Sequence, residues 1–161
     1  MKIFHKTIAR VSMLLVLFMA VAPAFAAEKH HLLGTWMVDV SKLTTPDPPA
    51  SVTMVLVEAG GGAYTMSIDI VTRDGIKLHS GGTFTPGGGT VAVQGNDEVD
   101  IVTFAMPSKN ILVMGAGLAG HPSHTRIWSQ ADDGKHMIET IVGHIDGKTP
   151  HIRTVIWDRG S

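Results

Sequence analysis

Beyond residue 30, turn-forming residues divide the sequence into short stretches of strand-forming residues at regular intervals. Val, Ile and Thr dominate these stretches, and Gly, Pro, Asp or Asn separate them about every 8–12 residues, the spacing of all-β folds. From Tyr64 to Ile70, apolar and polar residues alternate strictly. Such alternation predicts a strand with one buried face and one wet face. Because no longer window after residue 26 has a helical period, the pattern predicts an all-β chain.

The pattern predicts nine or ten strands. They are expected at Leu33–Val40, Ser51–Glu58, Ala63–Thr72, Ile76–Thr85, Thr90–Gln94, Val99–Ala105, Asn110–Gly115, Thr125–Ala131, Lys135–Ile145 and Pro150–Asp158. Sequential antiparallel strands with long apolar edges are protected from aggregation when the sheet closes on itself. We therefore expect an antiparallel up-and-down β-barrel of about 8–10 strands, whose interior holds side chains or one small ligand. A two-sheet sandwich is the competing fold.

The connections are also predictable. The pairs Asp74–Gly75, Asp133–Gly134 and Asp146–Gly147 each lie between two predicted strands, and Asp-Gly is a typical tight hairpin turn. Thr44–Ala50 contains three prolines and predicts an extended loop. Gly115–Gly120 is glycine-rich and predicts a mobile loop, at the mouth of the barrel.

Residues 1–26 have the layout of a secretory signal peptide. Lys2, Lys6 and Arg10 precede an apolar run, and Ala24–Ala26 supplies small residues before the expected cleavage site. The barrel domain then covers residues 27–161 and is exported, to the periplasm or the extracellular space. Cleavage removes three basic residues and no acidic one, leaving 10 bases against 14 acids.

Composition excludes several functional classes. Charged residues are only 17% of the chain and glycine is 18 of 161 residues, which argues against a coiled coil or a disordered tail. The acidic mature chain has little electrostatic reason to bind nucleic acid. No stretch after residue 26 is long and apolar enough to span a membrane as a helix. The absence of cysteine excludes thiol catalysis and thiolate metal sites.

Both ends of the mature chain resemble small secreted bacterial lipocalin-like (calycin-like) proteins. The matching features are Gly34–Trp36 at the first strand, Ser41–Lys42 before the proline-rich loop, Ser129 with the Asp132–Lys135 hairpin, and the terminal strand Val155–Arg159. The resemblance implies a barrel in which Trp36, after Gly34, plugs the closed end. It also implies that a basic residue of the last strand stacks on this tryptophan, with Arg159 the first candidate and Arg153 the second.

This resemblance and the strand pattern together favour a module that binds a small apolar or amphipathic ligand. Ligand sites in barrels are mostly apolar and use few polar groups. The apolar candidates are Tyr64, Met66, Ile68 and Ile70, and the candidate polar contacts are His79, Arg126 and Glu139. Glu139 with Arg126 or Arg153 forms either an ion pair lining a cavity or an exposed cross-strand pair. No cofactor is expected.

Two other functions stay open at this stage. One is an enzyme, or a protein that binds a metal through His121 and His124 or haem through His79, His144 or His151. A metal site needs three or four ligands in fixed geometry, however, and the nearest catalytic set, Ser129, His136 and Asp132 or Asp133, falls on an exposed hairpin. The other is a structural envelope protein with a filled core.

Overall fold

The computed structural model describes residues 30–93, 99–145 and 148–160. This part of the chain contains ten strands and one 3-10 turn. The strands are β1 (Gly34–Val38), β2 (Ser51–Gly60), β3 (Ala63–Val71), β4 (Lys77–Phe84), β5 (Thr90–Ala92), β6 (Ile101–Ser108), β7 (Ile111–Leu118), β8 (His121–Gln130), β9 (His136–Ile145) and β10 (Thr149–Arg159), and the 3-10 turn, η1, covers Val40–Lys42. The all-β prediction is confirmed.

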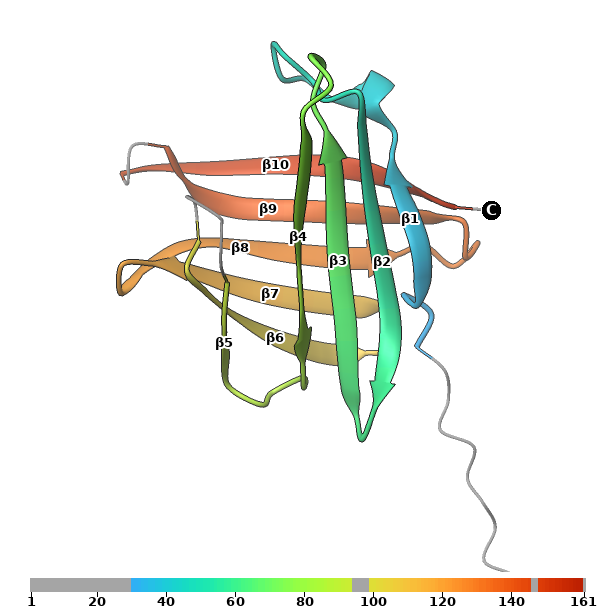
Figure 1. The fold of residues 1–161 in the computed structure, drawn as a ribbon, viewed down its shortest axis with the longest axis vertical. Coiled ribbons are helices and arrows are strands. Elements are labelled where there is room, and N and C mark those ends of the chain that lie inside the picture. The colour runs from blue at the N-terminus through green and yellow to red at the C-terminus, as the bar shows by residue number, and fades with distance from the viewer. Residues whose placement is uncertain (1–29, 94–98, 146–147, 161) are drawn as a thin grey trace, which may run out of the picture.

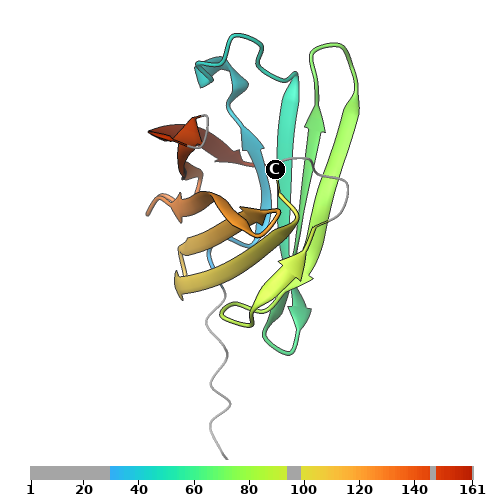
Figure 2. The ribbon, with the colours of Figure 1, turned by 90° about the vertical axis from the view of Figure 1, so that its left-hand side faces the viewer.

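The strands form one antiparallel sheet in the order β4-β3-β2-β1-β10-β9-β8-β7-β6-β5. The first and last strands pair, so Trp36 lies opposite Arg159. Within the described residues β4 and β5, at the two ends of the sheet, share no strand pairing. The fold is therefore a nearly closed up-and-down barrel, as predicted, and not a sandwich. In Figure 1, β2, β3 and β4 cross in front of β6 to β10 at a steep angle, and Figure 2 shows the two layers edge-on.

The side chain of Trp36 is completely buried beside the segment that enters β1 at one end of the barrel. Its indole Nε1 donates to Leu32 O at 2.8 Å, and the guanidinium carbon of Arg159 lies 4.2 Å from its ring centroid. This is the stacking partner that the resemblance ranked first, whereas Arg153 lies six positions earlier on β10. Gly34 has a φ of +124°, and a Cβ there would lie 2.9 Å from Arg159 Nη1. Only glycine fits both constraints.

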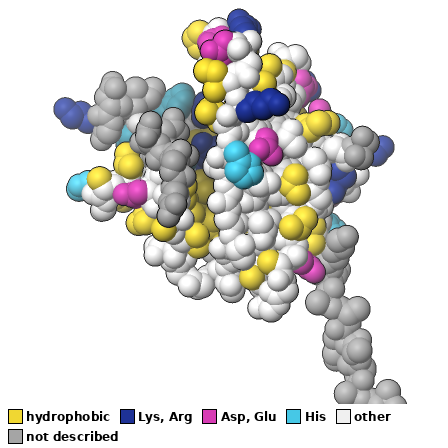
Figure 3. Space-filling view, in the orientation of Figure 1, with side chains coloured by type: hydrophobic (Ala, Val, Ile, Leu, Met, Phe, Trp, Pro, Cys, Tyr) yellow, Lys and Arg dark blue, Asp and Glu magenta, His cyan; other side chains and the backbone are white. Residues whose placement is uncertain are grey.

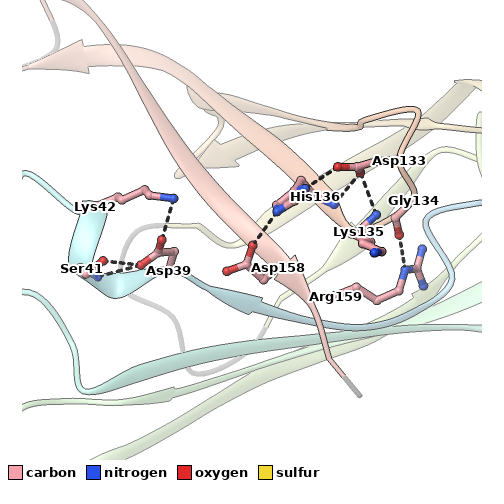
Figure 4. Close-up of polar contacts among 9 residues, drawn as sticks. All are labelled: Asp39, Ser41, Lys42, Asp133, Gly134, Lys135, His136, Asp158 and Arg159. Carbon is pink, nitrogen blue, oxygen red and sulfur yellow. Dashed lines mark hydrogen bonds and ion pairs between the residues drawn. The ribbon is translucent and has the colours of Figure 1, made fainter.

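Arg159 also ties three segments together at this end. Its Nε donates to Gly134 O in the β8–β9 turn at 2.6 Å (Figure 4). Its Nη1 and Nη2 donate to Leu33 O at 2.9 Å and to His31 O at 2.6 Å. The backbone of His31 in turn donates to Lys109 O, between β6 and β7. The segment before β1 thus crosses the end of the barrel and is held on both sides.

One predicted loop is a strand and a tight turn instead. β7 continues to Leu118 and β8 already begins at His121, so Gly115 and Gly117 lie within a strand. A Cβ at Gly115 would lie 3.2 Å from Thr103 Cγ2, and one at Gly117 would lie 3.0 Å from Ile101 Cγ1. These glycines allow side chains of β6 to lie close over β7, a known role of glycine in strands.

Two of the three predicted Asp-Gly turns lie in the described part of the chain. Gly75 and Gly134 adopt φ values of +88° and +68°, as the Asp-Gly turns require. Asp146–Gly147 and the predicted signal peptide, residues 1–26, lie outside the described residues. In the described part of the chain, no helix has the length and apolar character needed to cross a membrane.

Candidate functional site: an apolar cavity inside the barrel

A cavity of about 190 Å³ lies between the two crossing layers of the barrel. Its wall is mostly apolar. The apolar side chains are Met66, Ile68 and Ile70 from β3, Phe84 from β4, Val91 and Ala92 from β5, Val93 and Val99 from the segment between β5 and β6, Val102 and Phe104 from β6, Met114 from β7 and Trp128 from β8. Residues 80–83 of β4 line it too, so the cavity reaches the unpaired edge of the sheet. Figure 3 shows hydrophobic side chains gathered on this face beside β4.

An aromatic stack forms the floor of the cavity. The rings of Phe84 and Phe104 lie 3.9 Å apart between centroids, at an interplanar angle of 21°. Tyr64 stacks on the other side of Phe84 at 6.0 Å and meets the ring of His30 edge-on. Burial raises the pKa of Tyr64, and the charge of Glu58 adds to this shift. The phenol is therefore neutral over the whole physiological pH range.

A chain of polar side chains runs along one wall of the barrel interior. Glu139 Oε1 accepts from Arg126 Nη1 at 3.1 Å, and Glu139 Oε2 accepts from Trp157 Nε1 at 3.0 Å. Arg126 Nε donates to His124 Nε2 at 3.1 Å. Because an arginine nitrogen only donates, His124 Nε2 must be the unprotonated nitrogen of its ring. His124 and Arg126 line the cavity, and Glu139, 1% exposed, lies behind them.

Strand alternation explains why these groups meet. On β8, residues 124, 126, 128 and 130 face the interior, and on β9 residues 137, 139, 141 and 143 do so. Arg126 lies opposite Ile141, and Trp128 lies opposite Glu139. Arg126 therefore reaches one step along the barrel to contact Glu139. Of the two arrangements that the sequence left open for Glu139, the structure contains the buried pair, with Arg126.

A second, more open depression lies at the other end of β8 to β10. It is lined by His124, His144, His151 and Arg153, with Ile141, Gly143, Leu118 and Ser123 completing the wall. Gly143 lies opposite His151, and a Cβ there would lie 3.2 Å from His124 Cβ. The missing side chain leaves room between the two histidines.

The predicted apolar site residues divide into two groups. Met66, Ile68 and Ile70 line the cavity, as their alternation suggested. Tyr64 faces the same interior but lies below Phe84, outside the cavity wall.

The predicted polar contact His79 does not reach the cavity. It lies opposite Asp69, and its Nδ1 contacts Asp69 Oδ1 at 2.7 Å. Its side chain is 66% exposed. Since Ile68 and Ile70 face inward, Asp69 and its partner must face outward, so we exclude His79 from the candidate site.

The histidine alternatives find little support in the described residues. Nowhere in residues 30–93, 99–145 and 148–160 do three or more His, Cys, Asp or Glu side chains converge as a metal site. His121 and His124 lie on β8 rather than on a loop, and His124 is bonded to Arg126 and Ser123. His136 contacts Asp133 and Asp158 on the outer surface (Figure 4), and the structure gives it no contact with Ser129.

Most of the opposite wall of the cavity was not predicted from the sequence. Phe84, Phe104, Met114 and Trp128 come from strands on both sides of the gap between β4 and β5. Phe104 and Met114 belong to alternating apolar stretches, so their inward direction was readable, whereas Phe84 and Trp128 alternate with mostly small or polar residues and gave no such signal. That these four residues share a cavity with Met66 could not be read from the sequence, because it depends on how the sheet closes.

The fold and the cavity define a class: a small, nearly closed, ten-stranded up-and-down barrel with an apolar interior. Among solved structures, the chain is similar to two mutants of the fluorescent protein UnaG. Sequence identity is 13% for both, the TM-scores are 0.56 and 0.54, and the matches cover 81% and 80% of this chain and 97% and 96% of UnaG.

It is also similar to Rv2717c from M. tuberculosis, with a TM-score of 0.52 and 13% identity over 81% of this chain and 94% of that one. No protein-family model and no curated protein matches the sequence. At this identity the structural likeness establishes the fold alone.

Proposed function

We propose that this protein binds a small apolar or amphipathic ligand in the cavity between its two strand layers. The observation that carries the proposal is the cavity itself, about 190 Å³, lined by apolar side chains with Arg126 at one wall. Protein interiors are normally packed to crystal density, with few voids larger than a water molecule. A cavity of this size is therefore unusual in a filled core.

The size of the cavity limits the ligand. Binding sites for drug-sized molecules are about 300–1,000 Å³, whereas an apolar cavity of about 150 Å³ in another protein holds benzene. The buried part of the ligand is accordingly the size of a single ring. A larger ligand would extend through the gap beside β4.

The composition of the wall supports an apolar ligand in particular. Met66 and Met114 are flexible and polarisable and adapt to ligands of different shape. The stacked aromatic rings of Phe84 and Phe104 add further apolar surface to the wall.

Methionine methyl NMR tests this proposal directly. Toluene is added to protein carrying ¹³C-labelled methionine methyl groups. The signals of Met66 and Met114 should shift in a saturable way, while that of Met37, 46% exposed on the outer face, should not. Absence of any saturable shift would reject the proposal and favour a structural protein.

A cavity-filling variant provides the control. Gly82 lies opposite Met66 and faces inward, and a Cβ there would meet only Val91 Cγ1, at 4.0 Å. Gly82→Leu should therefore fit while abolishing toluene binding. Lys77→Leu, an apolar substitution on the outward side of the same strand, should leave binding unchanged.

We further propose that the protein acts outside the cytoplasm after losing residues 1–26. This rests on the basic, apolar and small-residue layout of residues 1–26, which is typical of a signal peptide. Intact mass and N-terminal sequencing of protein from the cell envelope or the medium should give a chain starting at Ala27. A full-length chain confined to the cytoplasm would contradict export without affecting the proposal on binding.

A further inference from the structure

The polar wall of the cavity contains one donor group that still has hydrogen-bonding capacity. Arg126 uses Nη1 for Glu139 and Nε for His124. Its Nη2 makes no hydrogen bond within the described part of the chain, and its side chain is 23% exposed while lining the cavity. A ligand that carries an acceptor atom can therefore be held by this nitrogen.

The charge of Arg126 is already neutralised. Glu139 lies 3.1 Å away and is almost completely buried, so the pair adds no net charge to the wall. His124 accepts a hydrogen bond through Nε2. A carboxylate entering the cavity would add a negative charge that has no counter-ion of its own, because Glu139 already neutralises Arg126, and such a charge is costly against a mostly apolar wall. A neutral oxygen would gain the hydrogen bond without that cost.

Trp128, on the same wall, contains a buried donor. It lies two residues from Arg126 on β8, faces the same interior and lines the cavity. Its indole Nε1 is buried without a hydrogen-bond partner among the described residues. Buried donors are normally satisfied, but this nitrogen is closed off from the cavity, so Arg126 Nη2 is the donor that a ligand can reach. Trp157, in contrast, donates to Glu139.

Resting on the proposed function, we infer that the natural ligand is a neutral, ring-sized apolar molecule bearing an oxygen acceptor such as a carbonyl. The oxygen accepts from Arg126 Nη2 beside the indole of Trp128. The ring lies against the aromatic and methionine side chains of the opposite wall. An arginine in a binding site would otherwise suggest an amphipathic carboxylate as the ligand, and the proposed class excludes simple carboxylates.

Three ligands of similar size test the inference on the wild-type protein. Acetophenone has the neutral oxygen, ethylbenzene lacks it, and benzoate replaces it with a charge at pH 7. Dissociation constants come from the titration of the Met66 and Met114 methyl signals. Acetophenone should bind about tenfold more tightly than ethylbenzene, the ratio expected of one hydrogen bond to a charged donor. Benzoate should bind at least about tenfold more weakly than acetophenone.

The outcomes separate the two proposals. If ethylbenzene binds as tightly as acetophenone, or benzoate binds more tightly, the inference is overturned while the cavity remains a binding site. If none of the three binds, both proposals fail.

A double variant assigns the preference to Arg126. Arg126→Met with Glu139→Gln removes donor and charge together, and a glutamine at position 139 can still accept from Trp157. The double variant should bind acetophenone no more tightly than ethylbenzene. Arg153→Met removes an arginine from the second, more open depression and should retain the wild-type preference for acetophenone. Retention of the preference in the double variant would overturn the role of Arg126.

Discussion

At the scale of single residues, the two members of the interior ion pair have unequal access to water. The side chain of Glu139 is 2% exposed and that of Arg126 is 23% exposed. Removal of either partner leaves the other unpaired, but only Arg126 can then recruit solvent. The cost of breaking the pair should therefore depend on which residue is changed.

We expect Arg126→Met to destabilise the barrel by about 3–5 kcal/mol, because it leaves a buried carboxylate without a cation. Glu139→Gln should cost only about 1–2 kcal/mol, since the partly exposed guanidinium is solvated and the amide still accepts a hydrogen bond. Urea denaturation at pH 7 measures both free energies of unfolding. The double variant should be more stable than Arg126→Met alone, and an equal cost for the two single changes would contradict this account.

At the scale of elements, Arg159 holds together segments that share no strand pairing. It bonds two carbonyls before β1 and one in the β8–β9 turn while stacking on Trp36. The fixed fork of a guanidinium suits three separate acceptors, and an ammonium group does not. Arg159→Lys should therefore lower the free energy of unfolding by about 2 kcal/mol although charge is retained. Lys135→Arg in the neighbouring turn is the control, and equal stabilities would show that charge alone matters.

The β8–β9 turn contains a carboxylate whose charge contributes to folding. The imidazole of His136 first, and then the backbone N–H groups of Lys135 and His136, lower the pKa of Asp133 from 3.8 to about 2. Figure 4 shows these groups gathered around it, with Asp158 on the far side of the imidazole. A folded-state pKa below the unfolded value means that the stabilisation is complete above the unfolded value. It is lost as the pH falls toward about 2.

Asp133→Asn should consequently be less stable than wild type at pH 6, and the difference should shrink between about pH 4 and pH 2. An asparagine side chain still accepts from the two backbone N–H groups, so the comparison isolates the charge. Urea midpoints measured across this pH range test the expectation. Asp132→Asn is the control. The native Asp132 makes none of these three contacts, so its variant should differ from wild type by the same amount at every pH in this range. A difference that stays constant down to pH 2 would contradict the argument.

How far the sequence determines these elements differs between strands. Strand-forming stretches separated by turn residues predicted nine or ten strands, and each predicted segment overlaps one of the ten described strands, because both signals are local. The segment from Gly115 to His124 was misjudged, because glycine and proline there suggested a loop. The glycines serve instead to admit Thr103 and Ile101 from β6, a requirement of cross-strand packing that only the register reveals.

At the scale of the whole molecule, the sequence predicted only the part of the cavity wall that β3 contributes. The inward direction of Met66, Ile68 and Ile70 follows from their own strand. That they share a cavity with Met114 and Trp128 depends on how the sheet curves and closes, and the meeting of Arg126 with Glu139 depends on the register of β8 and β9. The outward position of His79, which was expected to contact the ligand, follows from its pairing with Asp69, and this required the register of β3 and β4.

The gap between β4 and β5 predicts unequal hydrogen exchange around the barrel. Both strands are paired on one side only within the described residues, whereas β9 is paired on both sides, with β8 and β10. Backbone amides that point into the gap have no strand partner to protect them from exchange. In hydrogen exchange at pH 7, amides on the open edges of β4 and β5 should exchange orders of magnitude faster than those in the middle of β9.

Saturating toluene should slow exchange in all regions that exchange through global unfolding, because ligand binding stabilises the folded state. The amides on the open edges of β4 and β5 should still exchange fast. Equal protection of β4 and β9 would mean that the sheet closes completely, and the cavity would then have no side opening.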